Sequence, residues 1–422
     1  MSGVVTSVSL SASVRRERHL IGVRGGAWTA VVDERGRIEP DDGSVALDWY
    51  VAADDRWHDP RRETTVRQQR RAGVPVIDTR VRIPSGDVVQ RVYAVADYGG
   101  MVVSEFTNDS PLPVAVALTR GDVLCVRTPS PLGPQGIELP VGSVVFPIAH
   151  GATLRVALPM GVRPSHVDWA SIASADDMQR TWLAAVERAG YAVVPDKSLA
   201  PRINRLRSDL LVLSGRAPAS WGADLAGDDV ATVMALGELV RMGERVESWA
   251  TRDDVVDDLA RVTEALLRDH RSSSAIPWDV ERALFVAQCI FVSIGERRAA
   301  GDVASSRARL APAQAPSNAA PDGIRVSAWL DEQLVTPRRD GTVSMLGWGI
   351  PRLWLGAALD CRRIVADATR TLSFGLRWHG EKPAVLWEVD GDEGLVLDAG
   401  LTDPTFRTAQ HAGEALLTGF HA

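Results

Sequence analysis

Carboxylate side chains are the groups in this sequence whose positions most suggest catalysis. Enzymes that cleave glycosidic bonds use a pair of Asp or Glu side chains on either side of the scissile bond. Glu238 and Glu264 fall in the middle of expected helices among apolar neighbours, and Asp279 stands at a helix entrance, where a loop would face a cleft. We take Glu264 and Asp279 as the candidate catalytic acids. The simpler alternative is structural, because acids often form a solvated helix face or complement the dipole at a helix start.

Tryptophan is the second residue type that suggests a ligand. The chain has 13 tryptophans against four tyrosines, and an indole face packs well on the CH groups of a sugar ring. Trp278 precedes Asp279, and Trp348 lies between two glycines just before an expected helix. Both are candidate substrate-binding residues. Ordinary packing is the alternative, since the glycines beside Trp348 also let backbones approach an indole closely.

A third candidate group lies near the N-terminus, in residues 48–59. Trp57 is a candidate for stacking on a sugar, and Asp55 is a candidate for holding sugar hydroxyls or Ca²⁺. The spacing lacks the glycine and the closing glutamate of an EF-hand loop. The alternative is a strand with a buried tryptophan that leads into a polar loop.

Other chemistries have no pattern to support them. The eight histidines form no i, i+4 pair on an expected helix, and the three cysteines are too far apart in sequence for a zinc site or a disulfide framework. The sequence contains no phosphate-binding P-loop, no dinucleotide fingerprint after a strand and no Gly-x-Ser-x-Gly elbow. We therefore expect no metal and no cofactor.

The composition disfavours several classes of binding partner. A net charge of −7 disfavours a nucleic-acid-binding protein. The longest apolar stretch, residues 283–294, is too short to span a bilayer, and residues 1–10 lack the pattern of a signal peptide, so we expect a cytoplasmic protein without a membrane partner. Only two of the 47 basic residues are lysines. Genomic codon bias explains this arginine excess most simply, and the alternative is recruitment of arginine to bind carboxylate or phosphate.

The elements that must position these residues fall into three regions. Residues 1–165 contain short strands separated by turn signals, the clearest being a hairpin over residues 76–95, which predicts a β-sandwich. Residues 170–370 have helical periodicity, interrupted by a linker, expected to be mobile, at 301–322. Residues 371–422 return to β hairpins. The expected helices cover residues 176–189, 200–214, 228–242, 252–269, 277–299, 324–334 and 351–367.

The predicted fold class is therefore multidomain β plus α. It has an N-terminal β-sandwich, a helical-hairpin domain that forms a partial α/α toroid, and a small C-terminal β element. The short connection from residue 159 to residue 176 predicts that the sandwich docks against the helical part, with Trp169 largely buried.

This layout resembles the glycosidases that combine a β-sandwich with an (α/α) barrel, of the glucoamylase and glycogen-debranching type. Residues 51–57 (VAADDRW) and 376–388 (LRWHGEKPAVLWE) carry the local similarity. No catalytic acid of that family maps onto a matching motif here. A complete barrel has twelve helices, whereas about seven are expected here, so the chain looks like a shortened member.

Two functional hypotheses follow. The first is a glycosidase-like, carbohydrate-active protein that binds or hydrolyses an intracellular glucan or a small glycoside. The second is a non-catalytic scaffold or regulatory protein that keeps a degenerate form of the same architecture. The sequence leaves open whether the protein is an enzyme.

Overall fold

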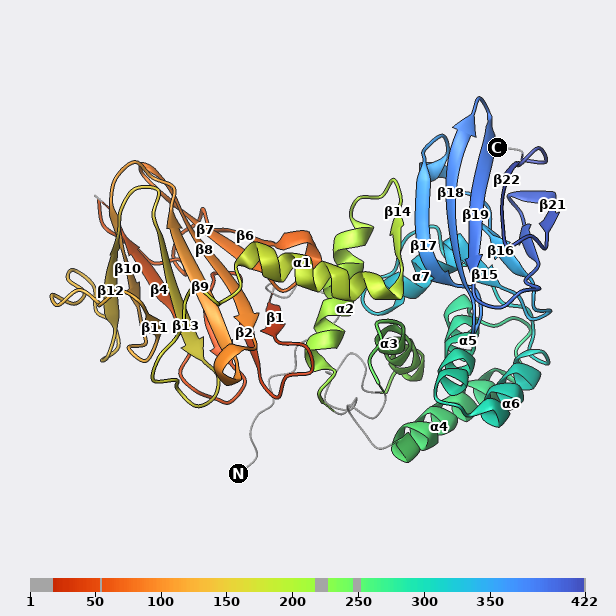
Figure 1. Ribbon diagram of the computed structural model, residues 1–422, viewed down its shortest axis with the longest axis horizontal. Coiled ribbons are helices and arrows are strands. Elements are labelled where there is room, and N and C mark those ends of the chain that lie inside the picture. The colour runs from red at the N-terminus through yellow and green to blue at the C-terminus, as the bar shows by residue number, and fades with distance from the viewer. Residues whose placement is uncertain (1–17, 54, 217–226, 246–251, 421–422) are drawn as a thin grey trace. The chain divides into compact units, whose positions relative to one another are not determined.

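The computed structural model describes residues 18–53, 55–216, 227–245 and 252–420. Within them the chain forms mostly antiparallel sheets and seven α-helices, which confirms a mixed β and α fold (Figure 1). The described residues divide into two compact units, the first holding residues 18–184 and 211–216 and the second the remainder. The segment considered as a signal peptide, residues 1–10, lies outside the described part. No helix in that part combines the length and apolarity needed to cross a membrane.

The first unit contains three β-sheets and one helix, α1. The sheet orders are β1-β2-β3, β12-β10-β4-β5 and β11-β13-β9-β8-β7-β6. The elements are β1 (His19–Gly22), β2 (Thr29–Val32), β3 (Ile38–Pro40), β4 (Trp49–Ala52), β5 (Trp57–His58), β6 (Arg67–Arg70), β7 (Ile77–Ile83), β8 (Gly86–Val95), β9 (Met101–Asn108), β10 (Val114–Leu118), β11 (Leu124–Cys125), β12 (Val144–Ile148), β13 (Thr153–Pro159) and α1 (Ala175–Val186).

The predicted hairpin over residues 76–95 is confirmed. Strands β7 and β8 pair antiparallel, with Ile83 opposite Gly86 across the turn. Val81 and Ile83 are buried while Arg80 and Arg82 are exposed, which is the alternation expected of a strand with one buried face.

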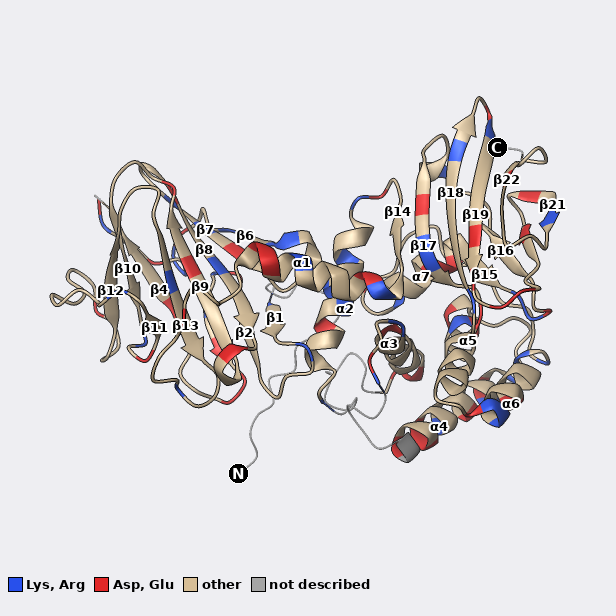
Figure 2. Cartoon of the chain, viewed as in Figure 1, with Lys and Arg blue, Asp and Glu red and all other residues tan. Residues whose placement is uncertain are grey.

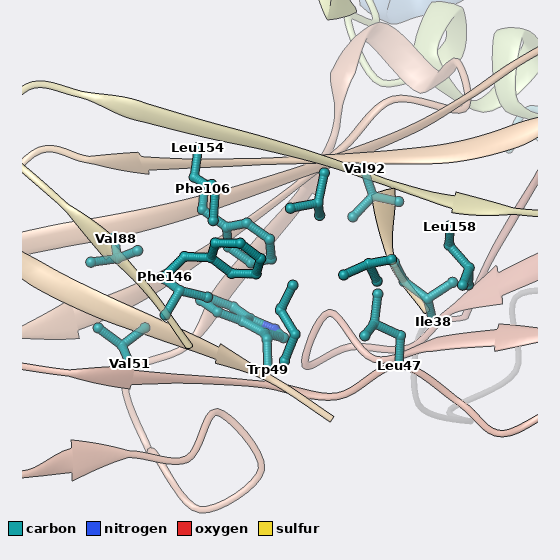
Figure 3. Packing of buried hydrophobic residues seen from close by; sticks show 14 of the residues in the cluster. Ile38, Leu47, Trp49, Val51, Val88, Val92, Phe106, Phe146, Leu154 and Leu158 are labelled. Carbon is teal, nitrogen blue, oxygen red and sulfur yellow. The ribbon is translucent and has the colours of Figure 1, made fainter. Parts of the chain in front are cut away.

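One hydrophobic core is shared by the three sheets of the first unit. Trp49, Phe106 and Phe146 meet there with aliphatic side chains such as Ile38 and Leu158 (Figure 3). The rings of Trp49 and Phe106 lie 5.4 Å apart, centroid to centroid. Trp169, expected to be largely buried, is partly buried.

The second unit combines helices with two further sheets. The sheet orders are β14-β17-β18-β19-β22 and β15-β16-β20-β21. Helices α3 to α6 lie together beyond one end of strands β17 to β19 (Figure 1). The elements are β14 (Tyr191–Val193), α2 (Leu199–Leu213), α3 (Asp229–Arg241), α4 (Arg252–His270), α5 (Trp278–Ser293), α6 (Arg297–Arg307), α7 (Arg325–Leu334), β15 (Val335–Pro337), β16 (Val343–Met345), β17 (Leu359–Val365), β18 (Thr371–His379), β19 (Lys382–Asp390), β20 (Leu397–Ala399), β21 (Asp403–Thr408) and β22 (Ala412–Leu416). The last three residues of α2 belong to the first unit.

Local signals explain where the helices begin and end. The Asp228 carboxylate accepts a hydrogen bond from the Ala231 amide, 2.9 Å away, and so caps α3. The single helix expected over residues 277–299 is instead two helices. Gly295 adopts a φ of +85° after α5, a conformation that glycine accepts easily, and the chain then starts α6.

The helix expected over residues 351–367 is wrong. This segment forms a 3₁₀ turn, Arg352–Trp354, and then strand β17. A β-bulge between Cys361 and Ile364 places Arg363 at a φ of +57° and brings two buried residues three positions apart. That spacing imitates helical periodicity, which explains the error.

The segment expected to be a mobile linker, residues 301–322, begins inside helix α6. Beyond α6 it is held by backbone hydrogen bonds, from the Ile276 amide to the Pro312 carbonyl (3.1 Å) and from the Gln314 amide to the Ile276 carbonyl (2.8 Å). These bonds tie it to the chain that enters α5.

Candidate functional site

Helices α2, α3 and α7 of the second unit bring together a buried cluster of charges centred on Glu238. Its carboxylate accepts hydrogen bonds from Arg207 Nε (2.7 Å), Arg241 Nη1 (2.8 Å) and Ser327 Oγ (2.9 Å). Glu238 is only 5% exposed. Burying so many charges is tolerated because each carboxylate oxygen faces a guanidinium or hydroxyl donor.

The cluster continues through α7 to Trp348. Arg241 Nη1 also donates to Asp331 Oδ2 (2.6 Å), and Arg282 of α5 lies 3.3 Å from both Asp331 and Glu332. The Trp348 indole N–H then donates to Glu332 Oε1 at 3.0 Å. Acids and arginines therefore alternate from Arg207 to Glu332.

The two glutamates of this chain of charges, Glu238 and Glu332, have opposite protonation preferences. Burial alone would raise the pKa of Glu238, but Arg207 and Arg241 outweigh it and lower that pKa to about 2. Burial raises the pKa of Glu332, and Arg282 with the Trp348 N–H offsets this only in part. Glu332 thus retains a proton at a higher pH than an ordinary glutamate does.

A second carboxylate, Glu281, lies one turn from the start of α5. It pairs with Arg307 of α6 (2.8 Å) and with Arg339 after β15 (2.7 Å). Burial acts to raise the pKa of Glu281, but the two arginines lower it below the ordinary value. Glu281 is therefore the deprotonated partner, and Glu332 the more readily protonated one.

Glu281 and Glu332 line one open pocket of about 500 Å³, which we call the Glu332 pocket. Its wall is formed by α5, α6, α7 and the loops around β15. The lining residues are Glu281, Arg282, Phe285, Arg307, Pro312, Ala313, Glu332, Thr336, Pro337, Arg338, Arg339, Asp340 and Trp348. The volume is in the usual range of small-molecule binding pockets.

On another side of the charge cluster lies a more apolar cavity of about 260 Å³. Met234, Val286 and Ile290 line it together with Glu238 and Arg282. Arg282 thus belongs to the wall of both spaces.

The structure places the four sequence-predicted residues of the second unit in different surroundings. Trp348 lines the Glu332 pocket and is half-buried. Asp279, at the start of α5, is bound by Arg325 Nε at 2.8 Å and does not line this pocket, and neither does Trp278. Glu264 is exposed on α4, so the expectation of apolar surroundings for it is wrong.

The two predicted residues of the first unit have partners within that unit. The Trp57 indole N–H donates to the Gln135 carbonyl, and Asp55 contacts His58 Nε2 at 3.0 Å. Asp54, between β4 and β5, lies outside the described residues. Trp49 is the buried tryptophan of this stretch, as the structural alternative for residues 48–59 expected.

Sequence reasoning counted Glu281 among the acids of the helical part but did not select it, and it missed Glu332. Glu281 follows the predicted Asp279 by two positions, a spacing that turns the two side chains to different faces of α5. Glu332 lies on α7, in which every residue after Arg325 is buried, but its sequence neighbours Asp331 and Gln333 are polar, as on a solvated helix face.

Comparisons with known proteins do not assign the chain to a family. No known family model matches the chain, and no curated protein matches it significantly. Among the residues that the structure describes, no group of three or more His, Cys, Asp or Glu side chains could hold a metal ion.

Proposed function

We propose that this protein is a glycosidase-like, carbohydrate-active protein that binds a glucan or a small glycoside in the Glu332 pocket. The architecture that we propose is a shortened form of the β-sandwich plus (α/α)-barrel arrangement. The observation that carries the proposal is Glu332, a buried carboxyl group with a raised pKa that accepts the Trp348 N–H in a pocket also lined by Glu281.

The pocket wall supplies the groups that sugars require. Trp348 offers an aromatic surface beside the two carboxyl groups, and arginines 282, 307, 338 and 339 offer N–H donors for sugar hydroxyls. Glu332 in its protonated form would donate a proton to a glycosidic oxygen, the role of the acid in this chemistry.

One observation favours the second candidate, a non-catalytic binding or regulatory protein. Hydrolysis also needs a base or nucleophile, and Glu281 already accepts three hydrogen bonds from Arg307 and Arg339. A carboxylate held in this way is weakly basic. Binding without turnover is the outcome that this geometry supports if no rearrangement frees Glu281.

Calorimetric titration with maltooligosaccharides and aryl glycosides tests the binding proposal. We expect saturable binding that Trp348→Ala weakens by about tenfold or more and that Trp278→Ala leaves unchanged. Trp278 is the matched control because it is half-buried in the same unit but does not line the pocket. Absence of binding at millimolar ligand, or equal losses in both variants, would reject the proposal.

Turnover of the aryl glycosides separates the two candidates. A glycosidase releases the aryl alcohol, and Glu332→Gln lowers the rate by at least about a hundredfold while binding persists. Binding with no release by the unaltered protein identifies the non-catalytic alternative.

A further inference from the structure

A third pocket of the same unit, of about 290 Å³, has four arginines in its wall. Its wall contains Arg307, Arg338, Arg339 and Arg370, and Asp367 is its one carboxylate among the described residues. We call it the Arg338 pocket. It shares Arg307, Arg338 and Arg339 with the Glu332 pocket, so the two spaces adjoin. Figure 2 shows basic and acidic positions close together on α5 and α6, which contribute to both walls.

The nearby acids leave this pocket with an excess of positive charge. Asp367 Oδ1 accepts hydrogen bonds from the Thr369 and Arg370 amides (2.8 and 2.9 Å), and Asp367 Oδ2 accepts one from Arg370 Nε (2.6 Å). Asp367 is therefore fully engaged within its own loop. Glu281 is shared between Arg307 and Arg339. Four guanidinium groups thus face two carboxylates.

Two of these arginines have capacity for a ligand. Arg338 is exposed, its Nε donates to Ser344 Oγ (2.7 Å), and it forms no ion pair with a described residue. Arg307 is 5% exposed, and its Nε has no hydrogen-bond partner among the described residues. A buried guanidinium N–H without an acceptor is costly, and an anion in the pocket would supply one.

The hairpin loop that carries Arg338 is held by its own backbone. The Arg338 amide donates to the Thr342 carbonyl (2.9 Å), and Gly341 adopts a φ of +85° in the turn. Asp340 in the same loop accepts hydrogen bonds from the amide and the hydroxyl of Thr342 (3.0 and 2.7 Å). This acid is therefore already engaged beside the basic pocket.

We propose that the Arg338 pocket binds a phosphate group, either free or as a monoester of the sugar held in the Glu332 pocket. A phosphate monoester carries close to two negative charges at neutral pH and therefore complements a wall that has more guanidinium groups than carboxylates. The planar fork of arginine binds phosphate oxygens in pairs, and concave walls of one charge sign concentrate the field. The sugar-phosphate form of this inference rests on the proposed function, whereas the free-phosphate form does not.

Calorimetry on the full chain tests the inference with three probes: inorganic phosphate, a hexose and the same hexose as its phosphate monoester. We expect saturable phosphate binding that weakens with added salt and that Arg338→Gln reduces by at least about tenfold. Arg338→Lys should restore part of the affinity, because lysine keeps the positive charge but lacks the planar guanidinium that donates paired hydrogen bonds. Arg309→Gln, a change of an exposed arginine that does not line the pocket, should have no effect.

Because Arg338 is exposed, its removal leaves no buried charge and should not unfold the protein. No binding of phosphate or of the monoester by the unaltered protein, or equal binding by Arg338→Gln, would overturn the inference. Phosphate binding by a protein that binds neither maltooligosaccharides nor aryl glycosides would support the anion site while rejecting the proposed sugar site. If the hexose phosphate monoester binds more tightly than both inorganic phosphate and the free hexose, the monoester is identified as the ligand.

Discussion

Glu238 shows at the scale of a residue why the second unit depends on complete charge pairing. Removing the charge of a buried, paired group leaves its partners unbalanced, and this costs more than the pair itself contributes. Glu238 holds both Arg207 and Arg241. We expect Glu238→Gln to lower the free energy of unfolding by about 3 to 5 kcal/mol, measured by urea denaturation.

Glu264→Gln is the matched control, because it makes the same change on an exposed helical position. Its effect on the free energy of unfolding should stay within about 0.5 kcal/mol. Comparable losses in the two variants would show that the charge of Glu238 is not balanced by its arginines in the folded protein.

The shifted pKa values of Glu332 and Glu238 predict that the two residues affect stability in opposite ways as the pH changes. The folded-state pKa of Glu332 is raised above 4.5, so the folded protein binds its proton more tightly, and stability falls as pH rises from 4.5 through that pKa. The folded-state pKa of Glu238 is lowered to about 2, so its stabilisation is complete above pH 4.5 and is lost as pH falls towards 2.

Unfolding free energies measured across pH 2 to 8 test this contrast. As pH rises above 4.5, the free energy of unfolding of Glu332→Gln should increase progressively relative to that of the unaltered protein. The loss of unfolding free energy caused by Glu238→Gln should be largest above pH 4.5 and should become smaller as the pH falls. Parallel pH profiles for the unaltered protein and Glu332→Gln would contradict the raised pKa of Glu332.

At the scale of elements, two glycines within helices separate the effect of helix–helix packing on stability from the effect of helix propensity. A Cβ at Gly237 on α3 would lie 2.3 Å from Val286 Cγ1 on α5, whereas a Cβ at Gly301 on α6 would meet no atom within 4 Å. We expect Gly237→Ala to destabilise the protein by about 1 to 3 kcal/mol because α3 and α5 must separate. Gly301→Ala should stabilise it by about 0.5 to 1 kcal/mol. Thermal unfolding measures both, and a stabilising Gly237→Ala would show that α3 and α5 do not pack in this way.

The elements also show how far sequence reasoning reaches. Helices bounded by an Asp and a Gly, such as α3 with Asp228 and Gly243, were predictable because their ends are set by local capping. Strand β17 was not, since its bulge at Arg363 imitates a helical spacing. Trp348 was selected for its type, but its hydrogen bond to Glu332 joins a loop to a buried helix, and no local pattern reveals such a pairing.

At the scale of the whole molecule, the first unit has a hydrophobic core made of its own residues. Phe106 is fully buried in the core of the first unit, against Trp49. We expect Phe106→Ala to destabilise that unit by about 3 to 5 kcal/mol. In hydrogen exchange read by mass spectrometry, β8, β9 and β13 should exchange faster while α3, α5 and α7 keep their protection. Equal acceleration in both sets would show that the two units unfold together.

The central claim is that a carbohydrate binds beside Trp348, and fluorine NMR of the protein labelled with 5-fluorotryptophan tests it most directly. Comparison with Trp348→Phe assigns the Trp348 resonance among the 13 tryptophans. On titration with maltooligosaccharides and aryl glycosides, we predict a saturable shift of the Trp348 resonance while that of Trp278 stays in place. A spectrum in which Trp348 does not move, or in which other tryptophans move instead, would contradict the account.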